Sequence, residues 1–203
     1  MDKPTLGQIY IISAASGTGK TTIVGQVLKR DPRVRLSISH TTRSVRTGEQ
    51  HGQDYFFVTV DEFKQLIAKN EFLEYAQVYD NFYGTNANVV RDLQAQGYDV
   101  ILEIDIQGAT QIREILPDAL SIFIAPPSMQ ELEQRLVGRG TDSEEVIAKR
   151  LGKARFEINQ VRYFDFIVIN DDLERACHDV LGIMHMQRLR CPKQLPFIDE
   201  LLK

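Results

Sequence analysis

A short segment near the start of the chain combines glycines, hydroxyl residues and one lysine in a pattern that can bind phosphate. Its residues are Ser13-Ala14-Ala15-Ser16-Gly17-Thr18-Gly19-Lys20-Thr21-Thr22. Glycines let a backbone curl until successive N–H groups point at one anion, and a following helix adds the positive end of its dipole. Lys20 would then reach the outer phosphates of a nucleotide, and Thr21 would ligate Mg2+. The sequence therefore predicts a phosphate-binding loop at a nucleotide site.

This segment departs from the G-x-x-x-x-G-K-[ST] pattern at its first position, where Ala14 replaces glycine. The remaining tripeptide Gly19-Lys20-Thr21 arises by chance in roughly one chain in ten of this length, because glycine makes up about 7% of residues. The alternative is an ordinary glycine-rich turn between a strand and a helix, with a lysine at the surface. The apolar run before the loop, 8–13, and the helical pattern after it, 21–29, favour the nucleotide site.

A second segment holds two arginines and a tyrosine that could bind another anion. Arg43 and Arg46 lie three residues apart, and Tyr55 follows shortly after them. Guanidinium forks and a phenol hydroxyl donate several hydrogen bonds to a phosphate monoester without competing as bases. Loop arginines in isolation are more often simply solvated, so these residues alone leave both interpretations open.

A third, strongly charged stretch covers 132–155 and contains the flexible tripeptide Gly138-Arg139-Gly140. Such a stretch could form a mobile basic lid. It could also form two solvated helices with ordinary i,i+4 ion pairs, which charge patterning by itself favours. Its basic residues are Arg135, Arg139, Lys149, Arg150, Lys153 and Arg155.

The elements that must position these residues alternate between short apolar runs and longer helical patterns. The pairs are 8–13 with 21–29, 100–104 with 107–116, 121–125 with 129–137, and 166–169 with 173–189. Runs such as Ile9-Tyr10-Ile11-Ile12 lack polar alternation, as expected for strands buried on both faces of a parallel sheet. The sequence therefore predicts an α/β fold with a central parallel sheet flanked by helices. Between 37 and 97 we expect an insertion on the sheet, made of several short segments of mixed pattern that include 56–58 and a helical segment at 62–69.

Size and composition limit the kinds of protein that this chain can be. Its 203 residues, 43% of them hydrophobic, suffice for one globular domain with a full core. A net charge of -4 argues against general binding to nucleic acid, and no apolar run approaches the ~20 residues that cross a bilayer. Two widely spaced cysteines and the lack of an export leader favour a reducing compartment. We expect a cytoplasmic protein without a nucleic-acid or membrane partner.

Taken together, these segments resemble the guanylate kinase family over almost the whole chain, from Ile9 to about Leu189. The resemblance implies a P-loop nucleoside monophosphate kinase fold in a single domain, 1–203, and alanine is tolerated at the first loop position in that family. It further implies a core of 1–36, 98–128 and 160–203, a GMP-binding insertion at 37–97 and a mobile lid at 129–159. The residues that carry the resemblance, besides the phosphate-binding loop, are Ser39-His40-Thr41-Thr42-Arg43, Arg46, Gly48-Glu49, Gly52-Gln53-Asp54-Tyr55-Phe56-Phe57, Glu71-Phe72-Leu73-Glu74, Tyr83-Gly84-Thr85, Ile104-Asp105-Ile106-Gln107-Gly108, Ala125-Pro126-Pro127-Ser128, Gly138-Arg139-Gly140 and Ile169-Asn170-Asp171-Asp172.

For the activity, the resemblance implies a transferase that moves the γ-phosphoryl group of Mg·ATP to GMP and dGMP. ATP would bind the loop from Ala14 to Thr22, with Asn170 near adenine. The phosphate of GMP would be held by Arg43, Arg46, Tyr55 and Tyr83, and guanine would be read by Ser39, Glu74, Thr85 and Asp105. Catalysis would rest on Lys20, Arg43, Arg135, Arg139 and Arg150.

Glu103 departs from this family, because it stands where an aspartate is expected. It would ligate Mg2+ together with Thr21 only after a small shift of the metal or of the strand.

Two other functions remain open at this point. A related kinase could phosphorylate another phosphorylated acceptor, such as a ribose phosphate, but it would not need the four residues implied to read guanine. A non-catalytic module of this family could bind phosphopeptides through the GMP site, but it would not need Lys20 and Thr21. The oligomeric state is left undetermined by the sequence.

Overall fold

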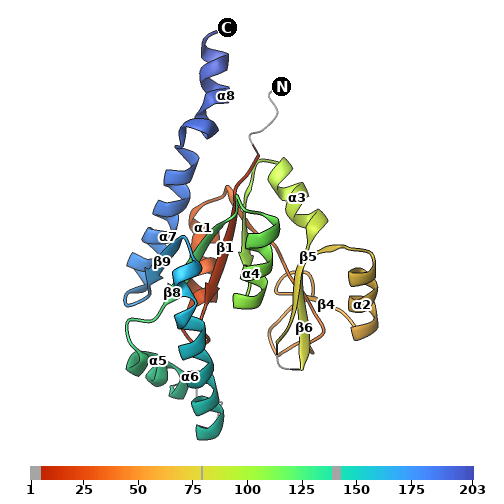
Figure 1. Cartoon of the computed structure of the whole chain (residues 1–203), viewed down its shortest axis with the longest axis vertical. Coiled ribbons are helices and arrows are strands. Elements are labelled where there is room, and N and C mark those ends of the chain that lie inside the picture. Colours follow the sequence, from red (N-terminus) through yellow and green to blue (C-terminus); the bar gives the residue numbers. More distant parts are fainter. Residues whose placement is uncertain (1–5, 79, 139–142) are drawn as a thin grey trace. The chain divides into compact units, whose positions relative to one another are not determined.

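The structure is a computed structural model that describes residues 6–78, 80–138 and 143–203 (Figure 1). Strands and helices alternate along most of the chain. In order, the elements are β1 (Ile9–Ala14), α1 (Lys20–Arg30), β2 (Val34–Leu36), β3 (His40–Thr41), β4 (Phe56–Phe57), α2 (Val60–Ala68), β5 (Phe72–Val78), β6 (Asn81–Asn86), α3 (Ala87–Ala95), β7 (Asp99–Glu103), α4 (Ile106–Ile115), β8 (Leu120–Ala125), α5 (Met129–Val137), α6 (Glu144–Asn159), a short 3-10 helix (Val161–Tyr163), β9 (Phe166–Ile169), α7 (Leu173–Arg188) and α8 (Cys191–Leu201).

A five-stranded sheet with the order β2-β7-β1-β8-β9 forms the centre of the fold. β2 pairs with β7, and β8 pairs with β9, in parallel in both cases. Side chains of the inner strands are buried on both faces, as at Tyr10, Ile11 and Ile12 in β1. The predicted α/β fold, with a parallel sheet made of unalternating apolar strands, is therefore confirmed.

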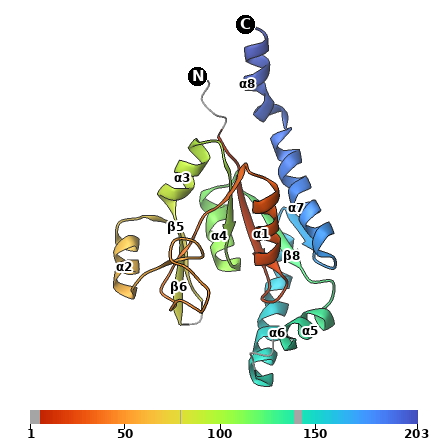
Figure 2. The same ribbon diagram turned by 180° about the vertical axis from the view of Figure 1, so that it is seen from behind.

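The chain divides into two compact units, and β1 contributes to both. Among the described residues, the first unit consists of Ile12–Pro32 and of the described part of Ser121–Lys203. Within it α1 contacts α7, and Arg188 near the end of α7 donates to the carboxylate of Asp31, the residue that ends α1. α8 continues beyond α7 at the C-terminal end and buries none of its residues (Figures 1 and 2).

The second unit consists of Leu6–Ile11 and Arg33–Leu120. It contains a separate four-stranded sheet with the order β4-β3-β6-β5, in which β6 runs antiparallel to both β3 and β5. Phe63 of α2 is fully buried and stacks on Phe72 and Phe82, with ring centroids 4.6 and 5.5 Å away. The expected helix near 62–69 is thus present as α2, and the mixed-pattern segment 56–58 contains the short strand β4.

Side chains cap the beginnings of most of the described helices. Thr59 and Glu62 form a capping box at α2, and a single oxygen caps α3, α4, α5, α6 and α7, supplied by Asn86, Asp105, Ser128, Ser143 and Asp172. Such oxygens satisfy backbone N–H groups that a helix leaves unpaired in its first turn. α1 differs, because its cap residue is Gly19, which has no side chain to offer. None of the described helices is both long enough and apolar enough to cross a lipid bilayer.

Candidate nucleotide-binding sites

The predicted phosphate-binding loop connects β1 to α1 in the first unit. Gly17 and Gly19 have φ angles of 93° and 94°, which is the left-handed region that glycine adopts readily. The hydroxyl of Thr18 donates to the carbonyl oxygen of Ala15 at 2.9 Å and closes the loop on itself. The loop ends at the uncapped start of α1, where the helix dipole is positive and no acidic residue occupies the first turn. This geometry suits an anion.

Two side chains from other parts of the first unit form hydrogen bonds at this loop. Asn170, which follows β9, is buried, and its amide Nδ2 donates to the carbonyl oxygen of Thr18 at 2.6 Å. Arg135 of α5 donates from Nη1 to the carbonyl oxygen of Thr18 at 3.5 Å and from Nη2 to that of Asn170 at 3.1 Å, and its Nε donates to Glu131 at 2.9 Å. Both residues, implied as an adenine neighbour and a lid arginine, therefore lie at the loop in this structure.

The close approach of Asn170 also explains why glycine stands at position 19. A Cβ atom there would lie 2.5 Å from Asn170 Nδ2, in addition to the left-handed backbone that L side chains rarely adopt. At Gly17 a Cβ would lie 2.9 Å from Leu136 Cδ2. At both positions the backbone conformation favours glycine, and a larger residue would also have to displace the end of a neighbouring side chain.

Gly19→Ala is expected to lower the free energy of unfolding by roughly 1 to 2 kcal/mol from backbone strain, with a further loss from the contact with Asn170. Urea denaturation measures this change. Gly25→Ala is the matched control, because Gly25 lies within α1 with nothing within 4 Å of a new Cβ, and alanine there is expected to stabilise the helix slightly. Equal stability changes in the two variants would contradict the strained geometry assigned to the loop.

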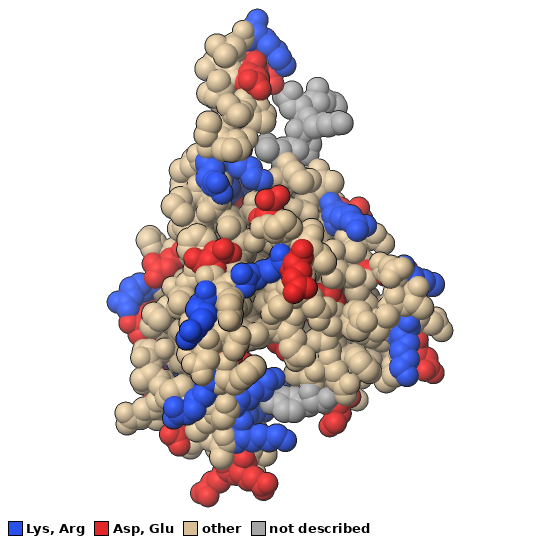
Figure 3. Space-filling view, viewed as in Figure 1, with Lys and Arg blue, Asp and Glu red and all other residues tan. Residues whose placement is uncertain are grey.

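The stretch predicted as a lid forms α5 and α6. Leu132 and Leu136 of α5 and Ala154 of α6 pack against Ala15 of the loop in one buried cluster. Arg150 lies half-buried on α6, and Figure 3 shows Lys and Arg side chains spread over the region of this helix. Arg139, the third predicted lid arginine, lies outside the described residues.

The other loop residues differ in exposure. Lys20 is half-buried, whereas the side chains of Ser16, Thr21 and Thr22 are exposed. Ala14 is the last residue of β1, a strand position that does not require glycine. The alanine at this position is therefore compatible with the loop.

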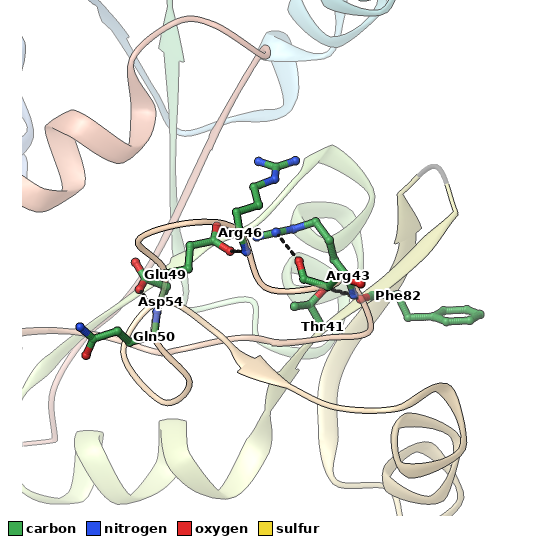
Figure 4. Close-up of polar contacts among 8 residues, drawn as sticks. Thr41, Arg43, Arg46, Glu49, Gln50, Asp54 and Phe82 are labelled. Atoms are coloured by element: carbon green, nitrogen blue, oxygen red, sulfur yellow. Dashed lines mark hydrogen bonds and ion pairs between the residues drawn. The ribbon is translucent and has the colours of Figure 1, made fainter. Parts of the chain in front are cut away.

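The second unit brings together the residues predicted to bind the acceptor phosphate. Arg43 forms an ion pair with Glu49 at 2.7 Å, and the second oxygen of Glu49 accepts the backbone N–H of Arg46 at 2.8 Å. The Arg43 guanidinium lies 5.4 Å from the centre of the Tyr55 ring, and Tyr55 meets Tyr83 edge to face at 5.9 Å. Figure 4 shows the Arg46 side chain extending away from the loop that Glu49 holds together.

Electrostatic shifts in this cluster follow from the same contacts. The hydrogen bond from Arg43 lowers the pKa of Glu49 below its usual value. Burial raises the pKa of Tyr55, and the nearby charge of Glu103 raises it further. Glu49 was not predicted as a site residue. Its spacing from Arg43 and Arg46 was the available signal, but the sequence does not show that one carboxylate holds both.

Two of the residues predicted to read a base, Thr85 and Asp105, interact with the buried carboxylate of a third, Glu74. Glu74 lies in β5 and is only 4% exposed. Its Oε1 accepts a hydrogen bond from the Thr85 hydroxyl at 2.6 Å. Burial, with a smaller contribution from the charge of Asp105, raises its pKa to about 7. Asp105 itself caps α4 by accepting the backbone N–H of Gly108 at 3.0 Å. Ser39 lies half-buried just before β3.

Two residues were predicted as ligands of Mg2+. Thr21 lies in the first turn of α1, in the first unit, and Glu103 ends β7, in the second. Among the described residues, no group of three or more His, Cys, Asp or Glu could hold a metal ion by itself. Mg2+ commonly takes one or two protein oxygens and completes its shell with waters and substrate phosphates. Thr21 and Glu103 each carry an oxygen of the type that Mg2+ accepts, and their joint role stays a prediction.

A buried parallel sheet, a left-handed glycine loop after its first strand and an uncapped helix define an α/β protein of the P-loop nucleotide-binding class. The chain belongs to the guanylate kinase family, because the family model described as guanylate kinase matches residues 6–187. The resemblance read from the motifs is thereby confirmed.

Individual proteins of this family match the chain over most of their own length. The guanylate kinase of Neisseria gonorrhoeae is 57% identical over 197 residues, which cover 97% of this chain and 96% of the relative. That of Hydrogenovibrio crunogenus is 51% identical over 93% of this chain and 92% of the relative. The crystal structure of guanylate kinase from Anaplasma phagocytophilum superimposes with a TM-score of 0.78 at 32% identity, covering 93% of this chain and 89% of that one.

Proposed function

We propose that this chain is a guanylate kinase that transfers the γ-phosphoryl group of ATP to GMP, giving ADP and GDP. Family membership supports the reaction class. The observation that carries the acceptor is the buried carboxylate of Glu74, hydrogen-bonded to Thr85 in the same unit as the Arg43, Tyr55 and Tyr83 cluster. That unit offers an anion site and a base-sensing carboxylate together.

Guanine suits this carboxylate because its N1–H and its exocyclic amine donate from one edge. A carboxylate accepts both hydrogen bonds at once, with Ser39, Thr85 and Asp105 as further polar partners in the proposal. Adenine offers an acceptor at N1, so a lone pair would face Glu74. A lost hydrogen bond to a buried charge costs about 1.5 to 3 kcal/mol, which corresponds to roughly tenfold to a hundredfold discrimination.

On the donor side, the loop from Ala14 to Thr22 would bind the phosphates of ATP through its backbone, with Lys20 reaching the outer ones. Asn170 would lie beside adenine. The transferring group passes through a loose transition state with charge spread over its oxygens, so cations and alignment supply most of the rate. A dedicated base is not needed, since the phosphate of GMP is largely dianionic near neutral pH, with a second pKa of about 6.

The lid arginines Arg135, Arg139 and Arg150 would close over the transferring phosphoryl group in this proposal, and Arg43 would hold the acceptor. For Arg135 this requires the guanidinium to exchange the carbonyl oxygen of Asn170 for phosphate oxygen. Thr21 and Glu103 would each offer an oxygen ligand to Mg2+, and the bound ion would supply positive charge to the phosphates. Use of dGMP and a cytoplasmic location remain predictions from the sequence.

A coupled assay of ADP release tests the proposal, with GMP, AMP, CMP, UMP and ribose 5-phosphate offered as acceptors. We expect turnover with GMP and rates at least tenfold lower with each of the others. Preference for ribose 5-phosphate would instead identify a kinase of another phosphorylated acceptor. Phosphopeptide binding without ADP release from any acceptor would identify a non-catalytic module.

A further inference from the structure

The carboxylate of Glu74 lies directly against the backbone of α4 at Gly108. A Cβ atom at position 108 would lie 2.6 Å from Glu74 Oε2 and 3.1 Å from its Cδ. Gly108 is buried inside α4, and its φ is not in the left-handed region, so the helix backbone does not demand glycine there. What requires glycine is the space that the carboxylate occupies.

One turn further along α4, Gln111 ties the helix to β5 beside that carboxylate. Its Nε2 donates to the carbonyl oxygen of Tyr75 at 2.9 Å, and its Oε1 accepts the backbone N–H of Tyr75 at 3.3 Å. β5 is the last strand of its sheet, so the amide of Gln111 occupies hydrogen-bonding positions that a further strand would use. Tyr75 follows Glu74 directly. The hydrogen bonds from Gln111 therefore hold the stretch of β5 backbone that carries the Glu74 carboxylate.

Gly108 and Gln111 lie three residues apart in α4 and are therefore neighbours on its surface. We propose that Gly108 and Gln111 are positioning residues for base specificity, and that they fix the place of the Glu74 carboxylate without contacting the substrate themselves. This inference rests on the proposed guanylate kinase function. It adds that α4, outside the predicted insertion 37–97, sets the position from which guanine is read.

Gly108→Ala is the direct test, because the new Cβ must displace the carboxylate while alanine supports the helix better than glycine does. We expect KM for GMP to rise and the ratio of kcat/KM for GMP over AMP to fall on the order of tenfold or more, with KM for ATP unchanged. AMP turnover should be unaffected, since adenine N1 cannot donate to Glu74. Gly182→Ala, in α7 with nothing within 4 Å of the new Cβ, is the matched control and should match the wild type.

A double-mutant cycle separates displacement of the carboxylate from general damage to the fold. In a Glu74→Ala background no carboxylate remains to be displaced, so Gly108→Ala should cause no further loss of kcat/KM for GMP. Losses that are the same with and without Glu74, or that fall equally on GMP and AMP, would overturn the proposal.

Gln111→Met provides a second measurement that does not depend on the Gly108 variant folding. It keeps a long side chain but removes both hydrogen bonds to Tyr75, and we expect it to raise KM for GMP several-fold with little change in kcat. Unchanged KM would remove Gln111 from the proposal. Failure of the proposed function looks different, because the wild-type protein itself would then show no preference for GMP.

Discussion

Replacing Lys20 with alanine is expected to lower kcat for ADP formation on the order of a hundredfold to a thousandfold, with little change in affinity for GMP. Lys20 is the first residue of α1, immediately after the left-handed Gly19. In the proposed function its ammonium group contacts the transferring phosphoryl group. The variant lacks this cation, so it stabilises the negative charge of the transition state less well. Removal of one such group typically lowers kcat about 10²- to 10³-fold. Steady-state kinetics measures kcat, and calorimetric titration measures GMP binding.

The separation of the two effects follows from where the residues lie. Lys20 belongs to the first unit, whereas Arg43, Glu74 and the rest of the predicted acceptor site belong to the second. Lys29→Ala, an exposed change near the other end of α1, should leave both quantities unchanged and serves as the control. Turnover retained in Lys20→Ala would refute the assignment of the loop.

The parts of the fold that the sequence predicted well are those whose signal is local. The strand, loop and helix around Gly19 combine an unalternating apolar run with a lysine-containing glycine turn, and both patterns act over neighbouring residues. α3 and α8 were not predicted. α3 is short and lies inside the insertion, and α8 contains Pro196, a residue that normally disfavours a helix interior.

The residues of the candidate sites could likewise be predicted from the sequence. The contacts that hold their side chains in place could not. The pairing of Arg43 with Glu49 depends on how one loop folds back, and the fit of Gly108 against Glu74 depends on α4 packing against β5. The sequence does not show which distant side chain packs against a glycine in a helix. Contacts between distant segments decide such roles, and single-sequence periodicity does not report them.

Glu74→Gln is expected to weaken GMP binding and, at the same time, to stabilise the folded protein above pH 7. Burial raises the pKa of Glu74 from its ordinary value of 4.5 to about 7, so between these pH values the folded protein holds a proton that the unfolded chain releases. The free energy of unfolding therefore falls as pH rises through this window, by roughly 3 kcal/mol in total. Glutamine avoids this loss and can still accept the hydrogen bond from Thr85.

Urea unfolding at pH 5 and pH 8 measures the stability difference, which should be small at the lower pH and largest at the higher. The exposed Glu114→Gln, on α4, is the control and should show no such difference. A stability advantage of Glu74→Gln that does not depend on pH would show that Glu74 is not held protonated in the free protein.

Guanine needs the ionised carboxylate, because a protonated oxygen or an amide would present a donor to its N1–H or amine. Binding of GMP must therefore expel the proton from Glu74, and KM for GMP should rise as pH falls below about 7 in the wild type, approaching tenfold for each pH unit. In Glu74→Gln the KM should be high at every pH and should vary only near and below pH 6, where the phosphate of GMP takes up its second proton. A parallel rise in both proteins would assign the titration to the phosphate of GMP, whose second pKa of about 6 is the same for each. The difference between the two profiles, rather than either alone, is what identifies Glu74 as the group that reads guanine.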